Sequence, residues 1–521
     1  MTGTTLLCGG RVYAPAGPPA TALLVEDGTI GWVGADPDAV GGADRTVELA
    51  GALVTPAFVD AHVHATDTGL AADGLQLSDA ASLAEALDAV ERHARQAAGR
   101  PVLGTGWDET RWPGRRPPTR QELDRAGYGG LVYLSRVDGH SAVVSSGLLA
   151  AGPELAGLAG FDDSGWLRTE AHHAARRIAL AAVTPGQRRD AHRATRRRAA
   201  ALGVGCLHEM AGPTVSSAAD LAGLLELAAA EPGPEVVGYW GELDGVEAAR
   251  ELGAAGAAGD LFADGALGSH TARMSAPYAD APGSTGHAYL DAAAVARHAV
   301  GCSRAGLQAG FHAIGDAAVR TVLQGYAAAA EEVGAAAFAA GRHRVEHLEM
   351  VDPDLVGELA RLGVVASVQP AFDAAWGGAD GMYAARLGPD RAVAMNPFGG
   401  LAAAGVRLAF GSDAPVTPLA PWEGVRAAVR HHTAGQRLTV AAAFEAHTRG
   451  GAFAGRRDSG VLAPGTPATF AVWAAPEAGT PDRLGPDGLG PDGLPDLAGG
   501  APAPACLRTV VRGTTVYTVE E

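Results

Sequence analysis

The chain has 521 residues, of which 19% are charged and 47% are hydrophobic, a composition that excludes a largely disordered protein. Its formal net charge of −18 argues against nucleic acid or an anionic membrane as the main partner, because phosphates would be repelled. The length allows one large domain with one or two smaller units. No long apolar run and no basic start followed by an apolar stretch occur, so we expect neither a membrane span nor a secretion signal.

The numbers of cysteine and lysine residues limit the kinds of active site that the chain can have. The four cysteines, Cys8, Cys206, Cys302 and Cys506, are far apart in sequence, which is typical of buried free thiols in a reducing cytoplasm. Lysine does not occur at all, because the 40 residues counted as lysine plus arginine are all arginine. An active site that depends on a lysine side chain is therefore excluded.

Both ends of the chain predict short β-strands with tight turns. Near the N-terminus, the Asp-Gly of EDGTI lies between apolar runs and is a strong hairpin signal. The C-terminus returns to this style in ATFAVWAA and LRTVVRGTTVYTVEE. We therefore predict a small composite β-sandwich formed by 1–52 and 455–521. The Pro-, Gly- and Asp-rich stretch 482–505, with its two tandem LGPDG units, predicts a surface loop.

The middle of the chain, 53–454, alternates short apolar strands with alanine-rich helical stretches, the pattern of parallel βα units. Eight such units predict a closed (β/α)8 barrel of the α/β class, like a TIM barrel. The predicted barrel strands are 57–64, 204–210, 235–240, 260–265, 307–313, 343–349, 364–370 and 407–413. The gap after the first strand is too long for a loop, so 70–195 is predicted to be an α/β insertion domain.

Metal-binding residue types stand at the carboxyl ends of the predicted strands, where such barrels have their active sites. His62 and His64 are two residues apart on the first strand, so both imidazoles face the same side. His312 ends the fifth strand, His347 the sixth and Asp413 the eighth. Imidazoles and a carboxylate that converge on one mouth suit zinc or a similar divalent ion. Four histidines in predicted helical or loop segments are expected to be structural: His172, His173, His431 and His432.

Several segments together resemble one known family. TPAFVDAHVH resembles the first-strand motif of the amidohydrolase superfamily. GWDETRW, RVDGHSAVVSS, ADGALGSHTA, FHAIGDAAV, RHRVEHLEMVDPD and FGSDAPV resemble motifs of its YtcJ-like branch, which includes N-substituted formamide deformylases. The resemblance implies a composite β-sandwich, a metal-centred barrel, and hydrolysis of a non-peptide C–N bond of the amide, N-formyl or N-acyl type in a small molecule.

The resemblance also assigns residues position by position. It places the metal ligands at His62, His64, His312, His347 and Asp413. It places Trp107, Asp108 and His140, all from the insertion, where they face the substrate. The residues alone allow a structural interpretation equally well. Trp107 could be a core aromatic, and Asp108 and His140 could be turn residues whose polar groups are hydrogen-bonded.

The sequence departs from the family pattern on the fourth strand. Many members have there a lysine whose carboxylated side chain bridges two metal ions, and this chain has Asp260. An aspartate carboxylate reaches only ~3–4 Å from Cα, several ångströms short of a carboxylated lysine, on ordinary bond lengths. Glu209, at the end of the second strand, is a further carboxylate that could take part of the lysine's role.

We therefore expect one divalent ion per chain, zinc or else iron or manganese. The first-strand histidine pair and Asp413 would form its core, and His312 or His347 would complete it. Asp413 is expected to act as general base and then as general acid toward the leaving nitrogen. His347 or His140 is expected to polarise the carbonyl and stabilise the oxyanion.

Three alternatives stay open. A mononuclear deaminase would need an acidic residue shortly after the fifth-strand histidine, where this chain offers only Asp316. A barrel that binds a small molecule without catalysis is the second alternative, and non-hydrolytic metal chemistry such as decarboxylation is the third. In each case we expect a small-molecule ligand, no nucleic-acid or membrane partner, a cytoplasmic location, and a monomer or a homodimer.

Overall fold

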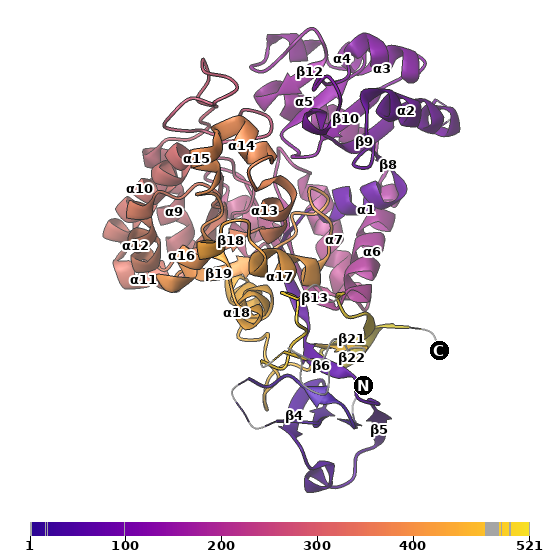
Figure 1. Cartoon of the computed structure of the whole chain (residues 1–521), viewed down its shortest axis with the longest axis vertical. Helices are drawn as coiled ribbons and strands as arrows, with labels where there is room; N and C mark the ends of the chain where they lie inside the picture. The colour runs from indigo at the N-terminus through magenta and orange to yellow at the C-terminus, as the bar shows by residue number, and fades with distance from the viewer. Residues whose placement is uncertain are drawn as a thin grey trace.

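The computed structural model describes residues 3–15, 17, 19–97, 99–474, 489–490, 492–499 and 502–519. The first part of the predicted Pro- and Gly-rich loop, including one LGPDG unit, lies outside these residues. Three units follow one another along the longest axis of the molecule (Figure 1): a β-sandwich, a barrel, and an insertion. Both termini lie at the sandwich end (Figure 1).

Segments from both ends of the chain form the β-sandwich, as predicted. One sheet has the order β4-β3-β1-β5 and the other β2-β6-β20-β21-β22. The strands are β1 (Thr4–Cys8), β2 (Arg11–Val12), β3 (Ala22–Glu26), β4 (Thr29–Gly34), β5 (Arg45–Glu48), β6 (Leu53–Pro56), β20 (Phe470–Trp473), β21 (Cys506–Val511) and β22 (Thr514–Thr518). Between β3 and β4, Asp27 and Gly28 have φ of 46° and 80°, the left-handed turn that Asp-Gly favours.

Eight parallel strands form the barrel in the order β19-β18-β17-β16-β15-β14-β13-β7. They are β7 (Phe58–Val63), β13 (Val204–Ala211), β14 (Glu235–Trp240), β15 (Gly256–Ala257), β16 (Gln308–Ala313), β17 (Arg344–His347), β18 (Val365–Val368) and β19 (Arg407–Phe410). The first and last strands meet at the mouth, where the Asp413 amide donates to the His62 carbonyl at 2.8 Å and the His64 amide to the Ala414 carbonyl at 2.9 Å. These bonds join strand ends that are about 350 residues apart in sequence.

The prediction for the fourth strand was wrong. The strand paired in the sheet is the two-residue β15, and the predicted segment 260–265 follows it. One isolated parallel bridge, between Phe262 and His312, is the contact of that segment with β16. Gly259, at φ 94°, turns the chain out of the strand path, a conformation that favours glycine. The apolar pattern of DLFADG therefore marks an irregular buried segment at the barrel mouth.

Helices surround the barrel strands. They are α1 (Ala65–Asp73), α6 (Pro185–Ala201), α7 (Ala218–Ala230), α8 (Val246–Glu251), α9 (Ala292–Ala305), α10 (Asp316–Val333), α11 (Ala335–Ala340), α12 (Pro353–Leu362), α13 (Pro370–Trp376), α14 (Met382–Leu387), α15 (Pro389–Ala392), α16 (Phe398–Ala403), α17 (Pro421–Val429), α18 (Val440–Glu445) and α19 (Gly451–Ala454). The barrel interior and the helix layer share one large apolar core. This core fixes the strand ends from which the site is built.

The insertion is an α/β unit with a second five-stranded sheet of order β12-β11-β10-β9-β8. Its elements are β8 (Leu75–Gln76), α2 (Leu83–Ala97), β9 (Val102–Trp107), α3 (Arg120–Ala126), β10 (Val132–Arg136), β11 (Ser141–Val144), α4 (Ser146–Ala151), β12 (Trp166–Arg168) and α5 (Thr169–Ala181). These elements span 75–181, between α1 and α6 of the barrel. It covers the carboxyl end of the barrel (Figure 1).

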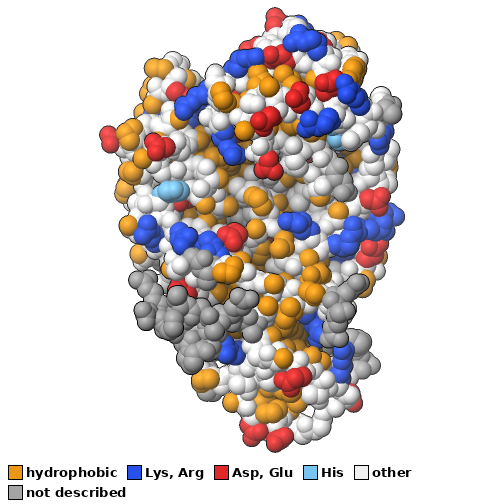
Figure 2. Space-filling view, turned by 45° about the vertical axis from the view of Figure 1, so that its right-hand side comes forward, with side chains coloured by type: hydrophobic (Ala, Val, Ile, Leu, Met, Phe, Trp, Pro, Cys, Tyr) orange, Lys and Arg blue, Asp and Glu red, His pale blue; other side chains and the backbone are white. Residues whose placement is uncertain are grey.

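The outer surface carries charges of both signs. On the face drawn in Figure 2, arginine and acidic side chains are interspersed over the insertion and the barrel. Among the helices of the described part of the chain, none has the length and apolarity that crossing a membrane requires.

Candidate metal centre

The imidazoles and the carboxylate predicted as metal ligands meet at the barrel mouth. Asp413 Oδ1 lies 3.5 Å from His62 Nε2 and 3.1 Å from His64 Nε2. These three side chains are buried, and their ligand atoms lie close enough together to share one ion. His312 and His347 lie beside them, with ring centroids 4.4 Å apart. The structure thus brings together all five residues.

Asp260 occupies the middle of this cluster. Its Oδ1 lies 3.5 Å from His312 Nδ1, 3.5 Å from His347 Nε2, and 3.6 Å from His62 Nε2. Its Oδ2 lies 3.1 Å from His64 Nε2. The expectation that aspartate is too short for this position was wrong, because it placed Asp260 on a regular strand.

The ligand atoms contact one another but lack hydrogen-bond partners. Within the described part of the chain, six buried atoms of these side chains have no hydrogen-bond partner: His62 Nε2, His64 Nδ1, Asp260 Oδ1, His312 Nδ1, His347 Nε2 and Asp413 Oδ1. Buried polar atoms are nearly always satisfied in folded proteins, so a cluster of exceptions needs an explanation. Ligands held about 2.0–2.1 Å from a tetrahedral zinc lie about 3.3 Å from one another, which matches these spacings. The residues therefore fit a divalent ion.

The far sides of two ligand rings are fixed by hydrogen bonds. His62 Nδ1 donates to Glu346 Oε2 at 3.0 Å, and Arg344 donates to both oxygens of Glu346 at 2.8 and 3.0 Å. His347 Nδ1 donates to Gln369 Oε1 at 2.9 Å. Such bonds fix the tautomer and direct the other ring nitrogen toward the ion. The Nε2 atoms of His62 and His347 are thereby turned toward the mouth.

The backbone of the ligand-bearing strand ends is strained. His347 has φ 69°, Leu348 has φ 48°, and Asp413 has φ 53°, in a region that costs roughly 1–3 kcal/mol for residues other than glycine. Strain of this kind is retained where surrounding packing enforces it, and it clusters at functional sites. It orients the side chains of His347 and Asp413 into the mouth.

Opposite charges dominate the electrostatics of the cluster. Burial lowers the pKa of His62, but the carboxylates of Asp260 and Asp413 outweigh it and raise the pKa to about 10. Burial raises the pKa of Asp413, but the nearby imidazoles, His62 first, hold it below its ordinary value. Burial also raises the pKa of Asp260, but His62 and the neighbouring imidazoles hold it well below its ordinary value, so both carboxylates are in the ionised form that binds metal.

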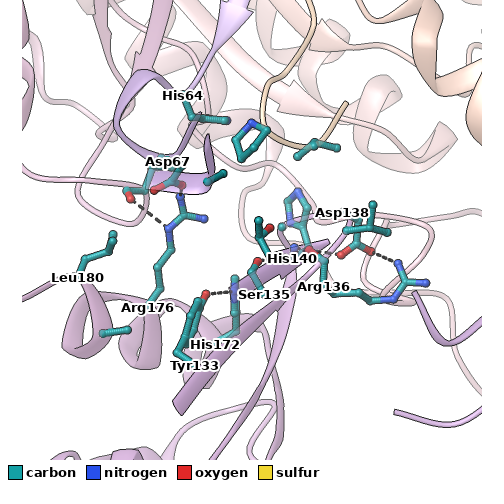
Figure 3. Close-up of a pocket in the computed structure, with 18 of the residues that line it drawn as sticks. His64, Asp67, Tyr133, Ser135, Arg136, Asp138, His140, His172, Arg176 and Leu180 are labelled. Carbon is teal, nitrogen blue, oxygen red and sulfur yellow. Dashed lines mark hydrogen bonds and ion pairs between the residues drawn. The ribbon is translucent and has the colours of Figure 1, made fainter. Parts of the chain in front are cut away.

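A cavity of about 120 Å³ extends from the cluster toward the insertion. His64, Asp260, His347 and Asp413 line its floor, and Figure 3 shows other lining residues. Its insertion wall carries polar and aromatic groups: Tyr133, Ser135, His140, His172, His173 and Arg176. Arg176 forms an ion pair with Asp67 (Figure 3). The wall therefore offers both stacking surfaces and hydrogen-bonding groups.

A much smaller cavity, of about 20 Å³, lies on the other side of His347 and Asp413. This space holds about one water-sized group. Its apolar walls come from two barrel loops and from α13 and α14: Leu267, Ile314, Phe372, Trp376, Met382 and Tyr383. His140 lines both cavities and packs on His312 with ring centroids 4.8 Å apart. The two cavities therefore flank the metal cluster asymmetrically.

The structure does not bring Trp107 and Asp108 to either cavity. Trp107 is fully buried in the core of the insertion, where its indole N–H donates to the Leu134 carbonyl at 2.8 Å. Asp108 accepts from Arg136 at 2.9 Å. Of the three insertion residues predicted to face the substrate, only His140 lines the site.

The sequence patterns did not indicate several of the residues found here. His172 and His173 lie in α5, expected to be structural, yet they line the larger cavity. The spacing of residues in this helix does not show that either histidine faces the cavity, because that placement depends on how the insertion packs over the barrel. Glu209 has a different place from the one considered: its Oε2 accepts the Ala65 amide at 2.7 Å, and burial raises its pKa to about 8.

Comparisons with known proteins agree with this architecture. A sequence model of the Amidohydrolase family (Amidohydro_3) matches residues 45–517. YtcJ of Bacillus subtilis (strain 168), which is named as an amidohydrolase, is 28% identical over 89% of this chain and 93% of its own length. The N-substituted formamide deformylase of Arthrobacter pascens is 30% identical, over 28% of each chain. A crystal structure of a metal-dependent hydrolase from Pyrococcus horikoshii OT3 has a TM-score of 0.71, with 26% identity over 90% of this chain and 97% of its own.

Proposed function

The chain belongs to the amidohydrolase family, in its YtcJ-like branch, and we propose that it hydrolyses a non-peptide C–N bond in a small N-acyl or N-formyl compound. The observation that carries the proposal is the set of unpartnered ligand atoms at the floor of a substrate-sized cavity. A partial likeness to the N-substituted formamide deformylase of Arthrobacter pascens supports the choice of bond.

The chain's own residues would perform three tasks. His62, His64 and Asp413 would hold a divalent ion, with zinc the best match for this donor set. When bound, such an ion supplies Lewis acidity and an activated water nucleophile. Asp413 Oδ1 faces both histidines and would be the ligand atom, and the Asp413 carboxylate would accept a proton from the activated water and deliver it to the leaving nitrogen. His140, which lines both cavities, would donate to the developing oxyanion, whereas His347 uses its Nδ1 proton for Gln369.

The asymmetry of the two cavities supports a substrate with unequal halves. The cavity of about 20 Å³ admits a group no larger than a formyl hydrogen or a methyl. The cavity of about 120 Å³ accommodates a larger substituent against the rings of Tyr133, His173 and Phe262. An N-substituted formamide or acetamide, with a one- or two-carbon acyl group and an aromatic N-substituent, fits this division.

The deaminase alternative receives less support. A ring deaminase needs a carboxyl group near the substrate, and Asp316 was the candidate. Asp316 lies at the start of α10, where its carboxylate accepts the Ser275 amide at 2.9 Å. It lines neither of the two cavities that flank the cluster.

A product assay tests the proposal. Metal-reconstituted protein is incubated with N-formyl and N-acetyl derivatives of aryl amines, and formate or acetate, free amine and ammonia are measured. We expect formate or acetate in equal amounts with the amine, dependent on added metal and lost with a chelator. Ammonia release from aminated heterocycles, without any acyl cleavage, would favour the deaminase.

A further inference from the structure

We propose that Arg176 and Tyr133 bind an uncharged oxygen acceptor, such as a carbonyl group, on the amine half of the substrate. The inference rests on the proposed function and narrows its substrate class to N-acyl aryl amines that carry such an acceptor on the ring. Both residues lie on the insertion wall of the larger cavity.

Arg176 has a hydrogen-bond donor that the protein does not use. Its Nε donates to the Val215 carbonyl at 3.1 Å, and its Nη2 pairs with Asp67. Among the described residues, none accepts a hydrogen bond from its Nη1, and this nitrogen is not fully enclosed by the protein. Figure 3 shows the side chain extending from α5, with its guanidinium group next to Asp67. The free N–H groups are therefore available to a molecule in the cavity.

Tyr133 offers a second donor. Its hydroxyl lies 3.0 Å from His172 Nε2, and both side chains are buried in the cavity wall (Figure 3). Burial lowers the pKa of His172 well below its ordinary value, so the imidazole is neutral and carries one N–H. Its Nδ1 is buried without a partner, so a hydrogen at that nitrogen would be an unsatisfied donor, which is costly. The hydrogen therefore lies on Nε2, which donates to Tyr133 and leaves the tyrosine O–H free to donate into the cavity.

The two donors act on the same region of the wall. Burial raises the pKa of Tyr133 to about 12, and the charge of Arg176 is the next largest influence on that pKa and opposes the rise. Charges influence each other in this way only at short range inside a protein. One acceptor oxygen can therefore face both donors.

Asp67 determines the charge of the acceptor. It lies in the first turn of α1, three residues after His64, and its carboxylate balances the charge of Arg176. A second carboxylate at Arg176 Nη1 would lie close to that of Asp67, and like charges at short range repel each other. An uncharged carbonyl oxygen accepts from the same N–H groups without this repulsion, and a charged donor makes the hydrogen bond stronger.

A substrate series tests the inference. N-formyl anilines are prepared with an acetyl, isopropyl or carboxylate group at the 3- or 4-position, because acetyl and isopropyl are similar in shape and differ in the acceptor. We expect wild-type kcat/KM to be about tenfold higher for the acetyl compound than for either counterpart, the factor that one charge-assisted hydrogen bond contributes. Arg176→Met should abolish the preference for acetyl over isopropyl, and Tyr133→Phe should reduce it.

Two further variants separate recognition from a general disturbance of the wall. Asp67→Asn removes the balancing charge but keeps an oxygen for Arg176, so the ratio of kcat/KM for carboxylate over acetyl should rise about tenfold. Tyr289→Phe is the matched control, because its hydroxyl lies 3.3 Å from His173, whereas Tyr289 is outside the set of described residues that line the larger cavity. It should keep the wild-type ratios. Circular dichroism and metal content verify that each variant is folded and loaded.

Binding of the free amines separates this inference from the proposed function. Aminoacetophenone and isopropylaniline are titrated into the purified protein by calorimetry, which does not require cleavage. Tighter binding of the ketone that is lost in Arg176→Met supports the two donors even if no N-acyl compound is cleaved, a result that would overturn the proposed function alone. The inference is overturned, and the hydrolase stands, if acetyl and isopropyl compounds do not differ in turnover or binding. A wild-type preference for the carboxylate, or an acetyl preference that survives in Arg176→Met, also overturns it.

Discussion

Two clusters of buried charge near the larger cavity differ in how they are satisfied. In the insertion, Arg136 donates from Nε to Glu109 at 2.8 Å, and from its two terminal nitrogens to Asp108 and Asp138 at 2.9 Å each. At the barrel mouth, six ring and carboxylate atoms of the described residues have no hydrogen-bond partner and contact only one another. The first cluster is satisfied by the protein itself, whereas the second fits an added ion. Burial and charge alone therefore do not mark an active site, whereas several metal-ligand atoms gathered together without hydrogen bonds do.

A substitution in the metal-ligand cluster at the barrel mouth should have the strongest effect on activity. Asp413→Asn removes the proton acceptor while keeping the shape of the side chain, so kcat/KM should fall about 10³-fold. The metal-free variant loses the ion-pair contacts of Asp413 Oδ1 with His62 and His64, so its unfolding curve is compared with that of the wild type. Steady-state kinetics on a confirmed N-acyl substrate, with unfolding curves, make the measurement. Wild-type turnover in this variant would remove Asp413 from the mechanism.

A substitution in the Arg136 cluster of the insertion should lower the free energy of unfolding. Arg136→Met leaves Asp108 and Asp138 buried without their cation and leaves Glu109 paired with Arg386 alone, which should destabilise the insertion by about 3–5 kcal/mol. Arg116→Met is the matched control, because Arg116 is half exposed and its pair with Glu122 is worth at most about 1 kcal/mol. Urea unfolding followed by tryptophan fluorescence compares the two. Equal midpoints would show that the Arg136 cluster is not structural.

A smaller effect, on metal affinity, is expected from the carboxylate that orients one of the metal-ligand histidines. Glu346→Gln weakens the hydrogen bond that fixes His62, and zinc affinity should fall about 10–100-fold. Glu349→Gln is the control, because this buried carboxyl group bonds to Tyr383 at 2.5 Å. Its zinc affinity should remain close to that of the wild type. Competition with a chromophoric chelator measures both, and unchanged affinity in Glu346→Gln would contradict the orienting role.

The smallest effect concerns substrate size. Met382→Ala enlarges the cavity of about 20 Å³ without touching a ligand. The ratio of kcat/KM for a propionyl over a formyl substrate should rise about tenfold, since each added methylene is worth roughly 1–3 kcal/mol in a fitted pocket. A ratio unchanged from the wild type would place the acyl group elsewhere.

The fold followed from the sequence where local pattern decides structure. Apolar strands that alternate with alanine-rich helices predicted the barrel, and the Asp-Gly turn predicted the first hairpin. His62 and His64 were identifiable because two-residue spacing on a strand directs both rings to one side. Asp260 was misjudged because its position depends on a strand that ends at Ala257 and on the φ of Gly259, which strand periodicity does not encode.

Residues from the insertion were harder to predict than those of the barrel. Trp107 ends β9 in a recognisable motif, yet it packs inside the insertion, whereas His173 on α5 lines the cavity. Both placements depend on the tertiary docking of the insertion over the mouth, and no local pattern encodes that contact.

Anomalous X-ray diffraction from crystals soaked with Zn²⁺ can locate an ion among the buried side chains of the barrel mouth. At the zinc absorption edge, we expect anomalous density within about 2.0–2.3 Å of His62 Nε2 and Asp413 Oδ1. Crystals that diffract well and show no anomalous density among these side chains would contradict the assignment of this cluster as a metal centre.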